Sequence, residues 1–235
     1  MESKALEALR TEYENYAYEC QYALNLAKAR ATNLEAFLER KTGRSIIANI
    51  TDRIKTFDSV IEKLHRKGYK DADITMELIR TRISDVAGLR IITLLRSDVY
   101  AIADALEKQP GFNLIERVDY IESPKPNGYK SLHLLVQVET YTDRSRILPI
   151  EIQIRTLGMN MWSAMDHLFN YKQSADPEVK KSFEEMAKRI NDFEDLAEKL
   201  NEKLYEPPTE PVVPRSPATK PSSKKNNQVK QAPIS

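Results

Sequence analysis

Apolar positions spaced three and four residues apart predict helices at both ends of the chain and between its apolar runs. The longest pattern covers 2–40, and the Ala-Thr-Asn at 31–33 could break this helix in two. A run that ends at Gly68 fits a glycine stop, and a run that opens at Ser97 fits a serine cap. The predicted helices cover 2–40, 57–69, 73–80, 97–111, 157–172 and a last stretch after Pro177.

Five shorter runs, apolar or alternating and rich in β-branched residues, predict strands. They cover 45–55, 86–95, 112–121, 131–140 and 146–155. Helical patterns lie between several of them, which is typical of a mixed layered domain. The fold class is therefore α+β: a mixed five-stranded β-sheet flanked by helices, with helical extensions at the N- and C-termini.

The chain divides into four parts along its length. A helical segment at 1–44 precedes the mixed domain at 45–175, and one helix at 176–205 follows it. The last helix has a near-heptad apolar stripe, formed by Val179, Phe183, Met186, Ile190, Phe193, Leu196, Leu200 and Leu204. Such a stripe needs a partner surface, in this chain or in another copy. Residues 206–235 are polar and hold seven of the 12 prolines, which predicts a disordered tail.

Composition narrows the class of protein. The 36 basic and 35 acidic side chains give a net charge of +1, so no global charge favours nucleic acid or an anionic membrane. The sequence contains no apolar run of about 18 residues and no leader pattern, so we expect a cytoplasmic protein without a membrane span. Cys20 falls on an apolar stripe and is predicted to be a buried thiol. The sequence has too few cysteines and histidines to form a structural zinc site, but its carboxylates could hold a hard metal ion.

The first polar cluster lies in "RIKTFDSVIEK" at 53–63. Arg53 and Lys55 share one face of a predicted strand, and Ser59 and Lys63 share one face of the next helix. Three cations and a hydroxyl could converge on one anion. The alternative is a solvated basic edge with an extended lysine side chain.

The second cluster lies in "DVAGLRI" at 85–91. Asp85 stands just before a predicted buried strand, Arg90 lies inside it, and Gly88 between them allows close backbone approach. A carboxylate at the mouth of a sheet is a suitable Mg²⁺ ligand. The alternative is that Asp85 caps a turn and Arg90 pairs with an acid on a neighbouring strand. A charged residue inside an apolar strand is uncommon, which favours a site.

The third cluster lies in "PIEIQIRT", where Glu151, Gln153 and Arg155 alternate with isoleucines. One face of this strand is apolar and the other polar. An edge strand that faces water would show the same alternation, and this is the favoured alternative. Glu151 could instead project over a cleft as metal ligand or general base.

The fourth cluster lies in "PKPNGYKSLH" at 124–133. Two prolines and Asn127-Gly128 predict a rigid turn that presents Tyr129 beside Lys125 and His133. An aromatic face, an amide and cations are the groups that a base-stacking pocket needs. The alternative is a tyrosine that packs at a hairpin end, with a histidine completing the core.

Together with the later "MWSAMDH", these four motifs resemble, in order and spacing, the synthetase domain of the RelA/SpoT family of alarmone synthetases, over about residues 45–172. The resemblance implies transfer of the β,γ-pyrophosphate of ATP to the 3′-hydroxyl of GDP or GTP, which gives ppGpp or pppGpp and AMP. It implies Mg²⁺ as the cofactor, bound by Asp85 and Glu151, with Glu151 also the general base.

The resemblance also assigns the substrate contacts. The implied ATP-binding residues are Arg53 and Arg90, which sandwich the adenine, and Lys55, Ser59 and Lys63, which hold the phosphates. The implied guanine-nucleotide residues are Tyr129 for stacking, Asn127 for the base edge, and Lys125 and His133 for the acceptor phosphates. Gln153 and Arg155 look like supporting residues of the same site.

None of His65, His133 and His167 is followed by Asp, and 1–44 is too short for the hydrolase domain of the long family members. The chain therefore resembles the stand-alone small synthetases, which implies a homotetramer built through terminal helices. One alternative is a toxic synthetase that modifies tRNA 3′ ends or adenine nucleotides. Another is a non-catalytic regulator that binds nucleotides or RNA.

Overall fold

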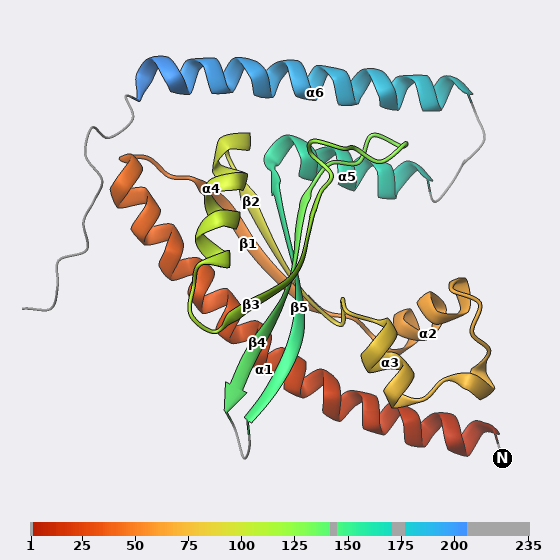
Figure 1. The fold of residues 1–235 in the computed structure, drawn as a ribbon. Helices are drawn as coiled ribbons and strands as arrows, with labels where there is room; N and C mark the ends of the chain where they lie inside the picture. The colour runs from red at the N-terminus through yellow and green to blue at the C-terminus, as the bar shows by residue number, and fades with distance from the viewer. Residues whose placement is uncertain (1, 142–144, 171–176, 206–235) are drawn as a thin grey trace, which may run out of the picture.

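The computed structural model describes residues 2–141, 145–170 and 177–205, and in these ranges the chain forms one twisted sheet with helices around it (Figure 1). The strands are β1 (Ile47–Ile54), β2 (Ala87–Thr93), β3 (Phe112–Asp119), β4 (Leu132–Tyr141) and β5 (Ser145–Thr156). Their order across the sheet is β1-β2-β5-β4-β3. β2 and β5 pair in parallel and the other neighbours are antiparallel, which confirms the predicted mixed five-stranded sheet.

The helices agree with the predicted ones to within a few residues. They are α1 (Glu2–Thr42), α2 (Phe57–Arg66), the 3₁₀ turn η1 (Asp71–Asp73), α3 (Met76–Arg82), α4 (Arg96–Glu107), α5 (Leu157–Asn170) and α6 (Pro177–Leu204). Thr56 and Thr75 cap α2 and α3 by accepting backbone N–H groups. Gly68, just after α2, has a φ of 91°, the left-handed conformation that a glycine stop requires.

Two details of the predicted helices are wrong. α1 runs unbroken through 31–33, because Ala31 and Leu34 lie on the buried stripe of the helix. Ser97 does not cap α4: the helix begins one residue earlier, and its N-cap is Leu95, which makes no side-chain bond. The backbone N–H and hydroxyl of Ser97 instead bind the carboxylate of Glu198 on α6, at 2.8 and 3.0 Å.

The core lies between the sheet and the pair α1 and α4. Ile150, Ile152 and Ile154 of β5 are fully buried in it, together with the apolar residues of both helices. Cys20 is also fully buried, as predicted, and burial raises the pKa of its thiol to about 11. The alternating residues of β5 therefore point to the opposite face of the sheet.

β5 is the central strand of the sheet, which rules out the edge-strand explanation of its polar residues. The alternation of polar and apolar residues in β5 is therefore not that of an edge strand that faces water, because other strands pair with β5 on both sides. Glu151, Gln153 and Arg155 thus lie in the middle of the face that α1 and α4 leave open.

α6 lies across one end of the molecule, beside α5 and near α4 (Figure 1). Its apolar stripe is only partly covered: Phe193, Leu196, Leu200 and Leu204 are each at least half exposed. The predicted tail at 206–235 lies outside the described residues. Among the helices that the structure describes, none has the length and apolar character that crossing a membrane would need.

Candidate active site

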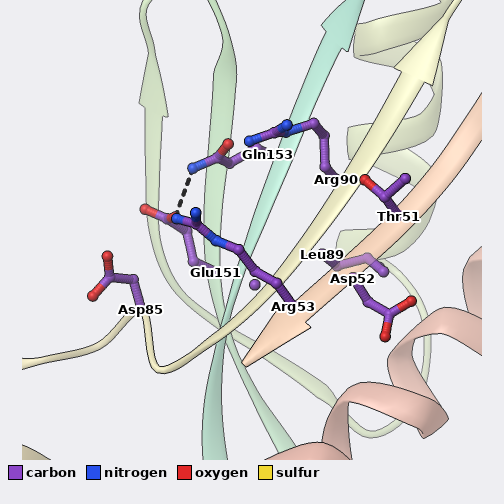
Figure 2. A pocket seen from close by; sticks show the side chains of 9 residues that line it. Thr51, Asp52, Arg53, Asp85, Leu89, Arg90, Glu151 and Gln153 are labelled. Atoms are coloured by element: carbon purple, nitrogen blue, oxygen red, sulfur yellow. Dashed lines mark hydrogen bonds between the residues drawn. The ribbon is translucent and has the colours of Figure 1, made fainter. Parts of the chain in front are cut away.

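A pocket opens on the uncovered face of the sheet where β1, β2 and β5 run side by side (Figure 2). It is lined by Thr51, Asp52, Arg53, Asp85, Gly88, Leu89, Arg90, Glu151 and Gln153. Sheet register explains the grouping, because Gly88 pairs with Arg53 on one side and with Glu151 on the other. Gly88 has no side chain, so backbone atoms line the pocket between the guanidinium of Arg53 and the carboxylate of Glu151.

Arg90 lies one step further along the same face, opposite Thr51 and Gln153. Its guanidinium projects into the pocket, as does that of Arg53 from the adjacent strand (Figure 2). The Nε of Arg90 is buried and has no hydrogen-bond partner in the described part of the chain. The two arginines, which the family resemblance placed in one site, line the same pocket, and neither forms an ion pair among the described residues.

Asp85 lies at the rim of the pocket, in the loop before β2, and two lysines converge on it. Its Oδ2 accepts from the ammonium groups of Lys55 and Lys63 at 2.5 and 2.8 Å. Burial raises the pKa of Asp85, but the hydrogen bonds and charges of the two lysines outweigh it and hold the pKa below its ordinary value. Ser59, one helical turn before Lys63, bonds to the Thr56 hydroxyl at 2.9 Å.

The other oxygen of Asp85, Oδ1, is buried and lacks a hydrogen-bond partner among the described residues. A buried, unpartnered carboxylate oxygen is costly unless something binds it. The described residues contain no cluster of three or more His, Cys, Asp or Glu that could hold a metal alone. Asp85 and Glu151 line one pocket as a pair of carboxylates, a donor set that fits Mg²⁺, which commonly takes one or two carboxylates plus substrate phosphates.

Glu151 is held on both of its oxygens. Gln153 donates to Oε2 at 2.8 Å (Figure 2), and Nδ1 of His133 lies 3.4 Å from Oε1. Burial raises the pKa of Glu151, but the hydrogen bond and charge of His133, with the bond from Gln153, bring it below its ordinary value. The carboxylate is therefore ionised at neutral pH and fixed in orientation.

The same contacts continue into a closed ring of five side chains, which we call the polar ring: Tyr129, His133, Glu151, Gln153 and Arg155. The Tyr129 hydroxyl lies 2.9 Å from Nε2 of His133 and accepts from Arg155 at 2.9 Å. Arg155 also donates to Oε1 of Gln153 at 2.6 Å, which closes the ring. Arg155 is 2% exposed, and burial lowers its pKa. The polar ring joins the β3–β4 loop (residues 120–131) to the carboxylate of Glu151.

Family comparison agrees with this geometry. A family model described as "Region found in RelA / SpoT proteins" matches residues 52–176, which include most of the pocket and the whole polar ring. The chain belongs to the RelA/SpoT family. The predicted resemblance is thereby confirmed.

Two small relatives of this RelA/SpoT chain are similar to it over most of their length. GTP pyrophosphokinase YwaC of Bacillus subtilis is 30% identical over 200 residues, which cover 85% of this chain and 91% of the relative. The crystal structure of small alarmone synthetase 1 from B. subtilis bound to its product pppGpp has a TM-score of 0.73 and 27% identity, and covers 82% and 98% of the two chains. The structure of that synthetase bound to AMPCPP has a TM-score of 0.69 and 25% identity, and covers 83% and 98%.

The β3–β4 loop of this family member carries the other predicted residues. The ammonium of Lys125 lies 4.5 and 4.9 Å from the ring centres of Tyr120 and Tyr129, so it packs between the two aromatics. Asn127 is exposed, and its Oδ1 accepts the backbone N–H of Tyr129 at 3.2 Å, which makes a local turn. Its Nδ2 lies 3.4 Å from the carboxylate of Asp166.

Sequence reasoning missed Tyr120 and Trp162 as parts of the site. The ring of Tyr120 packs edge-on against Tyr129 and His133, and Trp162 of α5 packs edge-on against Tyr129 at 6.4 Å between ring centres. "MWSAMDH" marked Trp162 by family likeness without a role, and no local pattern around Tyr120 distinguishes it from a hairpin residue.

Proposed function

We propose that this chain is a (p)ppGpp synthetase, which transfers the β,γ-pyrophosphate of ATP to the 3′-hydroxyl of GDP or GTP and releases AMP. The observation that supports it most directly is one pocket that holds Asp85, Glu151 and two arginines without an ion pair among the described residues, joined through His133 to the aromatic Tyr129. Relatives named GTP pyrophosphokinase and small alarmone synthetase, one of them bound to pppGpp, support the same reaction.

ATP binds on the β1–β2 side of the pocket in this proposal. Arg53 and Arg90 stack on the two faces of the adenine, a contact for which planar guanidinium groups are suited. Lys55 and Lys63, with the hydroxyl of Ser59, hold the triphosphate. The two lysines already lie within 3 Å of an anionic oxygen of Asp85, so the cations are in place to bind phosphate oxygens.

Mg²⁺ is the cofactor that the donor set fits, and Asp85 and Glu151 would hold it. When bound, the ion would neutralise charge on the phosphate oxygens and help to orient the triphosphate. Lys55 and Lys63 occupy Oδ2 of Asp85, whereas the buried Oδ1 has no partner among the described residues, which supports Oδ1 as the oxygen that would bind the cation.

The acceptor nucleotide binds on the β4–β5 side. Tyr129 stacks on the guanine, Asn127 contacts the base edge, and Lys125 and His133 contact the phosphates. Because Lys125 packs against Tyr129 in the structure, the incoming base replaces that contact and frees the ammonium for an anion. Gln153 and Arg155 orient Glu151 and Tyr129 through the polar ring.

Glu151 is the general base of the reaction. It takes the proton of the 3′-hydroxyl as that oxygen attacks the β-phosphorus of ATP, and the bond from the β-phosphorus to the α,β-bridging oxygen breaks. AMP leaves with that oxygen, and the β,γ-pyrophosphate becomes the 3′-diphosphate of the product. The protein contributes mainly in-line positioning and fixed charges, as is usual in phosphoryl transfer.

Two further features belong to the proposal. The exposed apolar residues of α6 support assembly into a homotetramer, since a patch of four large apolar side chains is unfavourable in water. ATP and GTP as substrates support a cytoplasmic location, where both nucleotides are abundant.

The decisive experiment incubates the purified protein with Mg²⁺ and γ-labelled ATP plus GDP, GTP, AMP or tRNA as acceptor. We expect label in ppGpp or pppGpp and stoichiometric AMP release with the guanine nucleotides. Label in tRNA or adenine nucleotides alone would replace the proposed acceptor, and nucleotide binding without AMP release would indicate a non-catalytic regulator.

A further inference from the structure

Helix α6 contacts the β3–β4 loop at two points that the reaction chemistry does not explain. The first is polar: the ammonium of Lys130 donates to Oδ1 of Asn191 at 2.8 Å. Burial lowers the pKa of Lys130, so this ammonium is partly removed from water and depends on its fixed partner. Lys130 directly follows Tyr129, so the contact acts on the backbone next to the stacking residue.

The second contact is van der Waals packing around Gly128, whose φ is 85°. A Cβ atom at Gly128 would lie 3.5 Å from Trp162 of α5 and 3.6 Å from the Cβ of Ala187 of α6. Trp162 in turn packs edge-on against Tyr129 at 6.4 Å and against Phe183 of α6 at 6.1 Å between ring centres. The β3–β4 loop, α5 and α6 therefore meet at one place, around a small cavity lined by Gly128, Lys130, Trp162, Ala187, Ile190 and Asn191.

α6 is itself held by contacts outside the loop. Glu194 is buried and accepts a hydrogen bond from the hydroxyl of Thr156 at the end of β5. Arg96 of α4 pairs with Asp195, and Ser97 binds Glu198 through two hydrogen bonds. Because α6 is fixed on α4 and β5, Asn191 and Ala187 present a fixed surface to the loop.

We propose that α6 is a positioning element for the guanine-nucleotide site, acting through Asn191 and Ala187 on the β3–β4 loop. The proposal rests on the proposed function, since it assigns the loop to the acceptor. A loop with a glycine at positive φ loses much conformational freedom when it is ordered, and a preformed loop avoids that loss on binding. Asn191 and Ala187 are thus positioning residues that set acceptor affinity and leave ATP affinity unchanged.

The test uses two variants with neighbouring controls on the exposed side of the same helix. Asn191→Ala removes the partner of Lys130, and Asp192→Ala is its control. Ala187→Leu places a larger side chain in the small cavity beside Gly128, and Lys188→Leu is its control; both control residues are exposed. Two variants of different chemistry keep the test valid if one of them fails to fold, which circular dichroism detects.

Binding is measured by the fluorescence of Trp162, the one tryptophan of the chain, with GDP and AMPCPP as probes. We expect Asn191→Ala to raise the Kd for GDP about tenfold, the scale of one lost buried hydrogen bond, and Ala187→Leu to raise it as well, with the Kd for AMPCPP unchanged in both variants. Equal weakening of both nucleotides, or no change in either, would overturn the proposal.

A second readout needs no nucleotide and separates this proposal from the proposed function. Trypsin cleaves after Lys130 only when the loop leaves its packed position, because Ser131 is buried. We expect faster cleavage at that bond in both variants than in both controls. If the wild-type protein makes no alarmone but cleavage follows this pattern, the function is wrong and the positioning role of α6 stands. Unchanged cleavage in both variants would refute the positioning role itself.

Discussion

Tyr129 and His133 are joined by a hydrogen bond of 2.9 Å between the phenol oxygen and Nε2. The other ring nitrogen of His133 lies 3.4 Å from Glu151. The residue proposed to stack on guanine is therefore connected to the proposed base through one side chain. The ring and the hydroxyl of Tyr129 serve different purposes, so substitutions can separate them.

Tyr129→Ala should weaken binding of guanine nucleotides much more than binding of ATP. Base stacking on an aromatic contributes about 1–3 kcal/mol, so the Kd for GDP should rise about 5- to 150-fold. Tyr129→Phe keeps the ring, and we expect it to keep that affinity but lower turnover by about two- to tenfold, because the polar ring loses one member. Isothermal titration with GDP and AMPCPP and steady-state kinetics measure both effects. An equal loss for both nucleotides would contradict stacking.

Glu151→Gln should abolish product formation and leave nucleotide binding largely intact. The amide keeps the size of the side chain but cannot take the proton, and general-base catalysis contributes about 10²–10⁴-fold. AMP release in a coupled assay is the measurement. Glu116→Gln is a matched control, since Glu116 is exposed on the same face of the sheet, opposite Leu135, which itself pairs with Glu151. Wild-type turnover in Glu151→Gln would refute the base assignment.

Asp85→Asn should raise the Mg²⁺ concentration needed for half-maximal activity and reduce the maximal rate, because a neutral amide binds a hard cation weakly. The control is Asp52→Asn, which lines the same pocket but pairs with Lys28 at 2.5 Å. Activity is titrated against Mg²⁺ at saturating ATP. The same Mg²⁺ dependence in Asp85→Asn and in the wild type would exclude Asp85 as a ligand.

Local patterns in the sequence predicted every strand and α-helix that the structure describes to within a few residues, but not the 3₁₀ turn η1, because the periods of apolar positions report local geometry. They could not tell a central strand from an edge strand at 145–156, since both show the alternation of Glu151, Gln153 and Arg155. That difference depends on long-range pairing, which brings β2 and β4 to either side of β5. The break suggested at 31–33 was wrong because packing of Ala31 and Leu34 outweighs weak local propensity.

Contacts within the candidate site that depend on long-range pairing were likewise not predictable from local sequence patterns. Family resemblance implied one site for Arg53, Arg90, Asp85 and Glu151, and in the structure all four line one pocket. The polar ring was not predicted, because it depends on the register of β4 against β5, which sets His133 opposite Gln153. Contacts between α6 and the β3–β4 loop join residues about 60 positions apart, for which no local pattern exists.

The outer face of α6 leads to a prediction about assembly. Phe193, Leu196, Leu200 and Leu204 are exposed, because polar residues such as Glu194 and Asn191 face the body of the protein. Leu196→Glu combined with Leu200→Glu should reduce a tetramer to smaller species, since it places charges in an apolar contact. Light scattering coupled to size-exclusion chromatography gives the mass, and Lys199→Glu is the control. A monomeric wild-type protein would exclude assembly through this helix.

Glu194 should make the stability of the protein depend on pH. Burial raises its pKa above the ordinary value of 4.5, outweighing the hydrogen bond from Thr156 and the charges of Arg96 and Lys130, with Asp195 acting in the same direction as burial. The folded protein thus holds this proton more tightly than the unfolded chain. Its contribution to stability is full below the unfolded pKa and is lost as pH rises through the raised, folded pKa.

The Glu194→Gln variant has no titrating group at position 194. Its free energy of unfolding therefore lacks the pH dependence that the carboxyl of Glu194 contributes. We expect the difference in Tm between Glu194→Gln and the wild type to shift in favour of the variant as pH rises from 4 through the raised pKa, and then to stay constant up to pH 8. Glu202→Gln, at an exposed position of α6, should follow the wild-type curve. Thermal unfolding by circular dichroism across this range is the measurement, and parallel curves for Glu194→Gln and the wild type would show that the carboxyl titrates alike in both states.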